Sequence, residues 1–104
     1  MNIRSFLIIF AMSSLLHSEE NFGIVVHGGA GVLSGLSKEQ QKIIEEKVSE
    51  TLISAYKMLE QGGSSIDIVE YAVSEFEDSP LFNAGRGSVY NANEIQEMDA
   101  SIMH

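Results

Sequence analysis

Two glycine-rich segments hold the residues of this chain that are best suited to chemistry. The first, HGGAG (27–31), follows a β-branched run, and an HGG loop in that place can offer backbone N–H groups to an oxyanion, as in lipases and esterases. Those enzymes also need a G-x-S-x-G nucleophile, and none occurs among the 104 residues. The alternative is a tight glycine turn in which His27 is a hydrogen-bonded core residue, because glycine tolerates conformations that other residues avoid.

The second segment, FNAGRGS (82–88), leads from a helical pattern into a strand pattern. It lacks the G-x-x-x-x-G-K-[ST] spacing of a phosphate loop and opens a strand rather than a helix. Its Asn83 amide and glycine backbone can stand near a reacting group, or can form a strained turn without chemistry. Further along, Glu97 and Asp99 share one face of a strand pattern, which does not by itself give the two carboxylates a common role.

Three acids, Glu75, Glu77 and Asp78, gather where the second helical pattern ends. The helix macrodipole is already negative there, so each acid costs roughly a few tenths of a kcal/mol. Either water solvates the three carboxylates, or a cation is bound by the unpaired carbonyl groups of the helix end and the next loop.

Two helices are predicted between these segments. The first covers residues 38–61, with a capping box formed by Ser37 and Gln40 and a stop at Gly62-Gly63; its apolar residues at helical spacing are Ile44, Val48, Leu52, Tyr56 and Leu59. The second begins at Ser64, with Asp67 in the capping-box position, and ends at Pro80. Its expected buried stripe is Ile66, Val69, Ala72, Val73 and Phe76.

Three strands complete the expected order. Residues 23–28 read as a buried strand, and residues 87–92 and 95–103 read as two strands with a bend at Asn93-Glu94. The order strand, helix, helix, strand, strand indicates one α/β unit.

Composition narrows the class of protein. Hydrophobic residues make up 44% and charged residues 20%, as in globular proteins. The net charge of −9 argues against binding nucleic acid or an anionic membrane surface. The chain has no cysteine, which excludes disulfides and thiolate metal sites, and its three histidines have no zinc-ligand spacing.

Residues 1–18 are typical of a signal peptide. Arg4 precedes an apolar run over 6–16 that is too short to cross a bilayer, and Ser18 is a small residue at which cleavage can fall. We therefore expect a secreted or extracytoplasmic protein with no membrane contact after cleavage, or a cytoplasmic one if the start codon is misassigned.

Three segments together resemble one family. IVVHGGAG (24–31), the stretch from Gly62 to Asn91 that contains FNAGRGS, and EMDASIM (97–103) closely resemble the isoaspartyl peptidase/L-asparaginase family, the plant-type asparaginases. The likeness covers residues 24–104. Residues 19–104 would then be the N-terminal part of the family's α chain, an incomplete domain.

The resemblance implies a fold and a reaction. The family fold is the αββα sandwich of the N-terminal nucleophile hydrolases, of which this chain would hold one strand, two helices and two strands. The precursor cuts itself before a threonine, and the resulting α and β chains stay together as a dimer of αβ units. The freed threonine attacks the side-chain amide of asparagine or the β-linked bond of an isoaspartyl dipeptide, with its own α-amine as base.

The nucleophile itself is not expected in this chain. The only threonine, Thr51, lies in the middle of the first predicted helix and lacks a glycine-rich context. Residues 1–104 alone are therefore predicted to be inactive. The alternatives are a truncated product that acts only as a partner of a full-length relative or is degraded, and a fragment of an esterase.

The resemblance also assigns residues around the site. Asn83, Gly28 and Gly29 match family positions close to the nucleophile and the autocleavage site. The segment 76–86 resembles a loop that binds a structural sodium ion, and no other cofactor is implied. The main-chain carbonyls concerned would be those of Phe76, Glu77, Ser79, Phe82, Ala84 and Arg86.

Two positions depart from the family pattern. Glu94 stands where the family commonly turns with glycine, so we expect a looser bend there. His104 follows Met103 where aspartate and glycine are usual.

Overall fold

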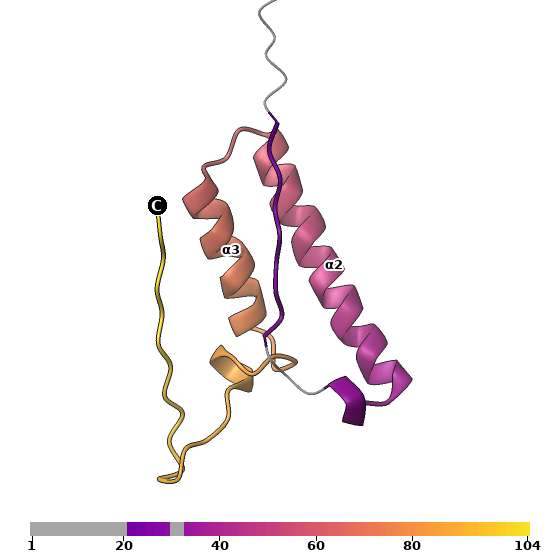
Figure 1. The fold of residues 1–104 in the computed structure, drawn as a ribbon, viewed down its shortest axis with the longest axis vertical. Helices are drawn as coiled ribbons and strands as arrows, with labels where there is room; N and C mark the ends of the chain where they lie inside the picture. The colour runs from indigo at the N-terminus through magenta and orange to yellow at the C-terminus, as the bar shows by residue number, and fades with distance from the viewer. Residues whose placement is uncertain (1–20, 30–32) are drawn as a thin grey trace, which may run out of the picture.

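Two antiparallel helices form the body of the molecule in the computed structural model, which describes residues 21–29 and 33–104. Helix α2 covers Lys38–Glu60 and α3 covers Ser65–Glu77, and short 3-10 turns lie at Leu33–Gly35 (η2) and Gly85–Gly87 (η3). Figure 1 shows α2 and α3 side by side. The predicted leader, residues 1–18, lies outside the described residues.

The start of α2 confirms its predicted capping box. Ser37 Oγ accepts a hydrogen bond from Gln40 N–H (3.2 Å), and Gln40 Oε1 accepts one from Ser37 N–H (2.9 Å). Two of the N–H groups that a helix start leaves unpaired are thus satisfied within four residues.

The glycine pair ends α2 as predicted. Gly62 has φ +83°, and its N–H donates to Leu59 C=O, while Gly63 N–H donates to Met58 C=O, both at 2.9 Å. This pair of bonds is a Schellman motif, which needs a residue in the left-handed region and therefore favours glycine.

Helix α3 also begins where the sequence places it. Ser64 Oγ accepts from Asp67 N–H (3.2 Å) and donates to the Asp67 carboxylate (2.7 Å). The helix ends at Glu77, three residues before Pro80.

Fewer residues of the predicted apolar stripe are buried between the two helices than expected. The buried residues are Thr51 and Ala55 on α2 and Ile68, Ala72 and Phe76 on α3. Of the stripe predicted for α3, Val69 and Val73 are each 48% exposed, and Tyr56 of α2 is 42% exposed. The reason is that both helices carry apolar residues on two faces, and only one face of each meets the other helix.

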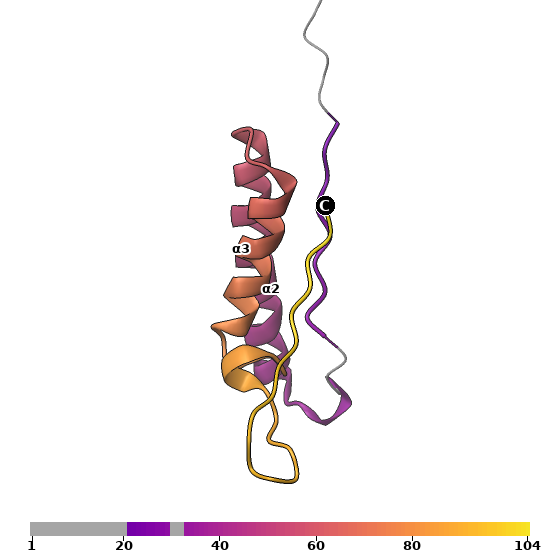
Figure 2. The ribbon, with the colours of Figure 1, turned by 90° about the vertical axis from the view of Figure 1, so that its left-hand side faces the viewer.

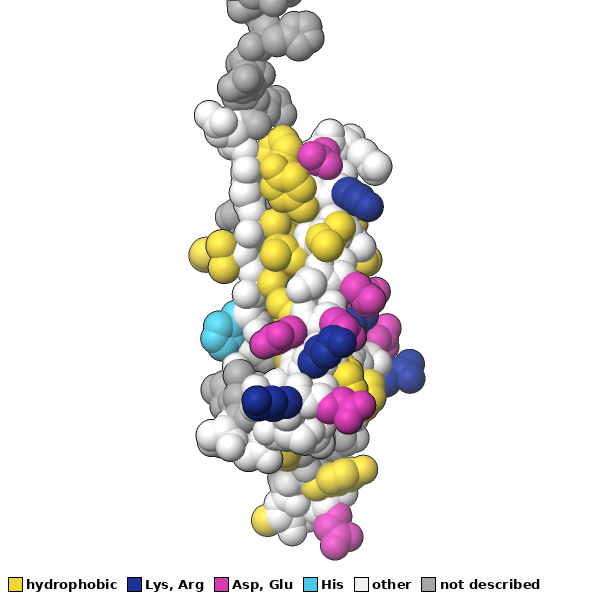
Figure 3. Space-filling model, turned by 90° about the vertical axis from the view of Figure 1, so that its right-hand side faces the viewer, with side chains coloured by type: hydrophobic (Ala, Val, Ile, Leu, Met, Phe, Trp, Pro, Cys, Tyr) yellow, Lys and Arg dark blue, Asp and Glu magenta, His cyan; other side chains and the backbone are white. Residues whose placement is uncertain are grey.

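The second apolar face points toward two extended segments. Residues 21–29 and residues 88–104, here called the C-terminal stretch, lie on the same side of the helix pair in Figure 2. Phe22 packs on Tyr56 with ring centroids 5.5 Å apart. Figure 3 shows a strip of apolar side chains on this face, with most of the charged side chains below it. A cavity of about 470 Å³ lies between the first extended segment and α2, lined by Ile24, Leu52, Ile53 and Tyr56 among others.

The three predicted strands are not confirmed. Residues 23–28, 87–92 and 95–103 contain no assigned strand within the described ranges, although most of this backbone is drawn extended. A strand is defined by its ladder of hydrogen bonds to a neighbour, and these segments do not form such ladders with one another. What remains of the predicted hairpin is a turn in which Asn91 N–H donates to Ile95 C=O (2.9 Å).

Candidate functional site

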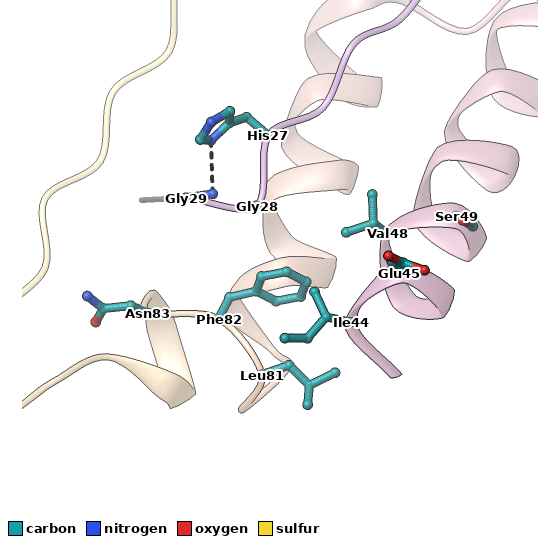
Figure 4. A pocket seen from close by; sticks show the side chains of 10 residues that line it. All are labelled: His27, Gly28, Gly29, Ile44, Glu45, Val48, Ser49, Leu81, Phe82 and Asn83. Carbon is teal, nitrogen blue, oxygen red and sulfur yellow. Dashed lines mark hydrogen bonds between the residues drawn. The ribbon is translucent and has the colours of Figure 1, made fainter. Parts of the chain in front are cut away.

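A cavity of about 590 Å³ lies where the first extended segment, the N-terminal half of α2 and the loop after α3 meet (Figure 4). The structure brings Gly28, Gly29 and Asn83 together on its wall, although more than 50 residues separate the glycines from the asparagine. The full lining is His27, Gly28, Gly29, Ile44, Glu45, Val48, Ser49, Leu81, Phe82 and Asn83. The three residues assigned by resemblance thus share one cavity, and their chemical roles stay predictions.

The glycine turn is shaped by close packing on one side and by a histidine on the other. A Cβ on Gly28 would lie 3.1 Å from Phe82 Cε1, so the backbone at this position sits directly on the aromatic ring. Gly29 has φ +95°, in the region that favours glycine, and its N–H donates to His27 Nδ1 (2.9 Å). His27 itself is exposed and is not the core residue considered from the sequence.

Asn83 holds the start of the C-terminal stretch. Its Oδ1 accepts a hydrogen bond from Val89 N–H (3.0 Å), and the side chain is exposed. The amide group therefore fixes the path of the loop on the cavity wall, while its NH₂ group makes no hydrogen bond with the described residues.

Phe82 is the anchor of this loop, a role the sequence did not reveal. It is 6% exposed and packs on Phe76 of α3 with ring centroids 4.7 Å apart. The same ring supports Gly28. A single phenylalanine in a loop carries no periodic signal, so only the tertiary structure shows that Phe82 joins α3 to the glycine turn.

The loop over residues 76–86 packs backbone carbonyl groups closely against two glycines. Glu77 C=O lies against Cα of Gly85, and the carbonyls of Phe82 and Pro80 lie against Cα of Gly87, where any side chain would collide with them. Hard cations such as sodium take oxygen ligands of this kind. The carbonyl oxygen of Pro80 is not among the six that the family resemblance implies.

The hydrogen bonds of the loop leave most of the predicted carbonyl oxygens without a backbone donor. Among the described residues, no N–H donates to the carbonyls of Glu77, Ser79, Phe82 or Arg86. Phe76 C=O accepts from the N–H groups of Ser79 and Asp78. Ala84 C=O accepts from Gly87 N–H alone, which leaves it a second lone pair. The six predicted groups are of the ligand type that a hard cation takes, and their role stays a prediction. In the described ranges, no group of acidic or histidine side chains could hold a metal ion.

Two of the three acids at the end of α3 have cationic partners that were not predicted from the sequence. Glu75 accepts a hydrogen bond from Lys47 Nζ of α2 (2.6 Å), and Asp78 pairs with Arg86 Nε (3.2 Å). The hydrogen bond to Glu75 raises the pKa of Lys47. These ion pairs explain the positions of Glu75 and Asp78 without a bound cation, so the acidic cluster no longer supports one.

A second cavity, of about 330 Å³, lies between the loop and the C-terminal stretch. Glu97 and Asp99 both line it, together with Asn83. Glu97 accepts a hydrogen bond from Asn91 Nδ2 (2.6 Å), and Asn91 Oδ1 accepts from the N–H groups of Asn93 and Ile95. Glu97 is thus engaged in holding the turn rather than paired with Asp99.

Thr51 does not belong to the cavity. It lies in the middle of α2, 1% exposed, against α3. Its hydroxyl is buried without a hydrogen-bond partner in the described structure. A group enclosed in this way cannot reach a substrate.

Neither α2 nor α3 is both long and apolar enough to cross a membrane.

Comparison with known proteins identifies the family. A model of the asparaginase family matches residues 20–104. The isoaspartyl peptidase/L-asparaginase of Bos taurus is 47% identical over 81 residues, covering 78% of this chain and 26% of the relative. The isoaspartyl peptidase/L-asparaginase of Homo sapiens is 45% identical over 80 residues (77% and 25%), and the isoaspartyl peptidase of Escherichia coli K12 is 43% identical over 82 residues (77% and 26%).

The matched region contains all three parts of the cavity wall. These are the glycine turn, the N-terminal half of α2 and the FNAGRGS loop. The chain spans about a quarter of the length of these relatives. The extent of the family match and the level of identity agree with the resemblance of the three sequence segments. This chain belongs to the isoaspartyl peptidase/L-asparaginase family of N-terminal nucleophile hydrolases.

Proposed function

We propose that this chain is the N-terminal part of an amidohydrolase that converts L-asparagine to aspartate and ammonia, cleaves β-aspartyl dipeptides, or does both. The observation that carries the proposal is the 43–47% identity to relatives named for these two activities. In the complete protein, a threonine freed by autocleavage outside residues 1–104 is the nucleophile.

The contribution of this chain is one wall of the site. The cavity brings the Asn83 amide and the backbone of Gly28 and Gly29 to a common surface, and such donors stabilise charge that develops on oxygen during acyl transfer. The attacking group comes from the remainder of the protein, because Thr51 is buried in α2 and its amine is part of a peptide bond.

The missing parts of the fold and assembly belong to the same proposal. Residues 23–28, 87–92 and 95–103 become strands of the αββα sandwich when neighbouring strands from the remainder of the α chain and from the β chain pair with them. Their extended backbone on one side of the helix pair supports this proposal. The complete protein is a dimer of αβ units, and a structural sodium ion sits in the loop 76–86.

We also propose export through residues 1–18. N-terminal sequencing of the mature protein tests this. A first residue near position 19 supports a cleaved leader, and recovery of Met1 from the cytoplasm contradicts it.

The main test compares two polypeptides. One is residues 1–104 alone, and the other continues in frame past His104 to a threonine in a glycine-rich context. Ammonia release from asparagine and cleavage of a β-aspartyl dipeptide are measured for both. We expect activity, and two chains on a denaturing gel, only for the longer polypeptide.

Two results would contradict the proposal. Hydrolysis by purified residues 1–104 would show that the nucleophile lies within them. A stop codon directly after His104 in the transcript would instead favour a truncated product that serves as a partner of a full-length relative or is degraded.

A further inference from the structure

The ring of Phe82 lies against the backbone of the glycine turn. A Cβ added to Gly28 would lie 3.1 Å from Phe82 Cε1 and 3.4 Å from Phe82 Cδ1. Among the described residues, this ring is the group that the added Cβ would meet. The missing side chain of Gly28 and the size of the Phe82 ring are thus matched, because a methyl group on Gly28 would press on the ring.

Helix α3 holds the ring in place from its other side. Phe82 is buried and packs on Phe76 of α3 with ring centroids 4.7 Å apart. Phe76 is itself one of the buried residues of α3. A ring enclosed in this way has few positions open to it, because protein interiors are close-packed. The Gly28 backbone therefore rests on a group whose place is set by α3.

The loop that carries Phe82 also fixes the Asn83 amide. Asn83 directly follows Phe82, and its Oδ1 accepts a hydrogen bond from Val89 N–H (3.0 Å). Before Phe82, the buried Ser79 accepts a hydrogen bond on its Oγ from Leu81 N–H (3.3 Å). Because the backbone is held on both sides of Phe82, a displacement of the ring is passed on to the segment that carries Asn83.

We propose that Phe82 is a positioning residue for the hydrolysis proposed above, on which this inference rests. Its ring sets the position of the Gly28 backbone relative to the Asn83 amide, and both of these groups line the 590 Å³ cavity. In Figure 4 the ring lies below Gly28 and beside the loop that leads to Asn83. Groups that stabilise a transition state must be placed accurately, since a misplacement of about 1 Å costs roughly 100-fold in rate. The buried ring acts through these two groups.

Two single variants disturb the contact from its two sides. Both are made in the longer polypeptide that continues in frame past His104, and kcat is calculated per cleaved chain, so that a defect in self-cleavage is counted separately. Phe82→Leu removes the far end of the ring and keeps an apolar side chain in the core. Gly28→Ala adds the methyl group that presses on the ring, and the φ of Gly28 is outside the left-handed region, so the backbone accepts alanine. Each variant should lower kcat about tenfold or more and change KM less than about threefold.

The double variant tests whether the two sizes are matched. In Gly28→Ala/Phe82→Leu, the added methyl group takes space that the shorter side chain leaves, so kcat should recover to within about threefold of wild type. Gly29 offers the matched comparison, because its φ is +95° and its added Cβ meets nothing within 4 Å. Gly29→Ala is strained by its own backbone, so Phe82→Leu should not recover the activity that Gly29→Ala loses.

Ile68→Val separates positioning from lost stability. Ile68 is buried in α3 and does not line the cavity, so this variant should melt at a lower temperature and keep kcat and KM. If Phe82→Leu does not fold, Phe82→Met takes its place, because methionine fills irregular gaps in a core.

Three results would overturn the inference. Phe82→Leu that melts at a lower temperature but keeps the kcat of wild type would show that the ring only fills the core. A loss in Gly28→Ala that Phe82→Leu does not recover would show that the two residues are not coupled. A wild-type polypeptide that hydrolyses neither asparagine nor a β-aspartyl dipeptide would contradict the proposed function, and this inference with it.

Discussion

Lys47 of α2 donates a hydrogen bond of 2.6 Å to Glu75 of α3, and the two side chains are 25% and 37% exposed. Twenty-eight residues separate them in sequence, and the pair is the ion pair between the two helices in the described structure. Lys47 lies one turn before the buried Thr51, and Glu75 lies nearly one turn after the buried Ala72, so the pair is a clamp between the two helices.

The clamp should contribute modestly to stability. Because both groups are partly exposed, solvent screening limits the pair to about 0.5–1 kcal/mol. We expect Lys47→Met and Glu75→Gln each to lower the free energy of unfolding by about this amount, and the double variant to lose little more than either. Urea unfolding of the four proteins checks the coupling, and additive losses would show that the pair does not interact.

The same pair predicts a pH dependence with a definite sign. The hydrogen bond to Glu75 raises the pKa of Lys47 above its ordinary value of 10.5. Folding therefore favours the charged amine, and the contribution is fully present below that value and is lost as the pH rises through the higher pKa of the folded state. The stability difference between wild type and Lys47→Met should shrink above pH 10.5. A constant difference across that range would contradict the prediction.

Thr51 offers a stabilising substitution. Its hydroxyl is buried without a partner, and an unsatisfied buried hydroxyl costs about 1–3 kcal/mol. Thr51→Val keeps the branched shape and removes the hydroxyl, so we expect a gain of about 1 kcal/mol in thermal or urea unfolding. Thr51→Ser is the control, because it keeps the hydroxyl and leaves a methyl-sized gap, and should cost about 1 kcal/mol. A loss in Thr51→Val would show that the hydroxyl has a partner.

The helices could be predicted because their signals are local. Ser37 with Gln40, and Ser64 with Asp67, satisfy helix starts within a few residues, and Gly62 ends α2 by its own left-handed conformation. The strands could not be confirmed in the same way. Their pairing depends on partners distant in sequence, and a β-branched run alone makes no hydrogen bonds.

Only part of the candidate site could be predicted from the sequence. Asn83, Gly28 and Gly29 could be selected by resemblance, whereas their common cavity depends on Phe82 packing between α3 and the glycine turn. The cationic partners of Glu75 and Asp78 were missed for a similar reason. Lys47 is distant in sequence, and Arg86 meets Asp78 because the loop folds back on the end of α3.

Replacing Glu94 by glycine should raise the stability of the protein. Glu94 has φ +60°, a left-handed conformation that costs a side chain about 1–2 kcal/mol, where only a looser bend was predicted from the sequence. Glycine loses roughly 0.5–1 kcal/mol of that gain through the entropy of the unfolded chain. Glu94→Gly should therefore raise stability by about 0.5–1 kcal/mol, and Glu94→Ala, which keeps Cβ, should change it by less than about 0.5 kcal/mol. An equal effect of both would assign the change to the carboxylate instead.

Gly85 and Gly87 test the cation loop, because each touches a carbonyl that we assign to sodium. An added Cβ on Gly85 collides with Glu77 C=O, and one on Gly87 collides with Phe82 C=O. Wild type should melt at a higher temperature in sodium chloride than in choline chloride at equal ionic strength, since a ligand that binds the folded state stabilises it. Gly85→Ala and Gly87→Ala should each lower stability by about 1 kcal/mol or more and abolish the sodium effect. Gly23→Ala is the matched control, because its Cβ meets nothing within 4 Å, and it should retain the effect. A sodium effect that survives in Gly85→Ala and Gly87→Ala would place the ion elsewhere, and the absence of any effect in wild type would leave these carbonyls as a tight turn without a bound ion.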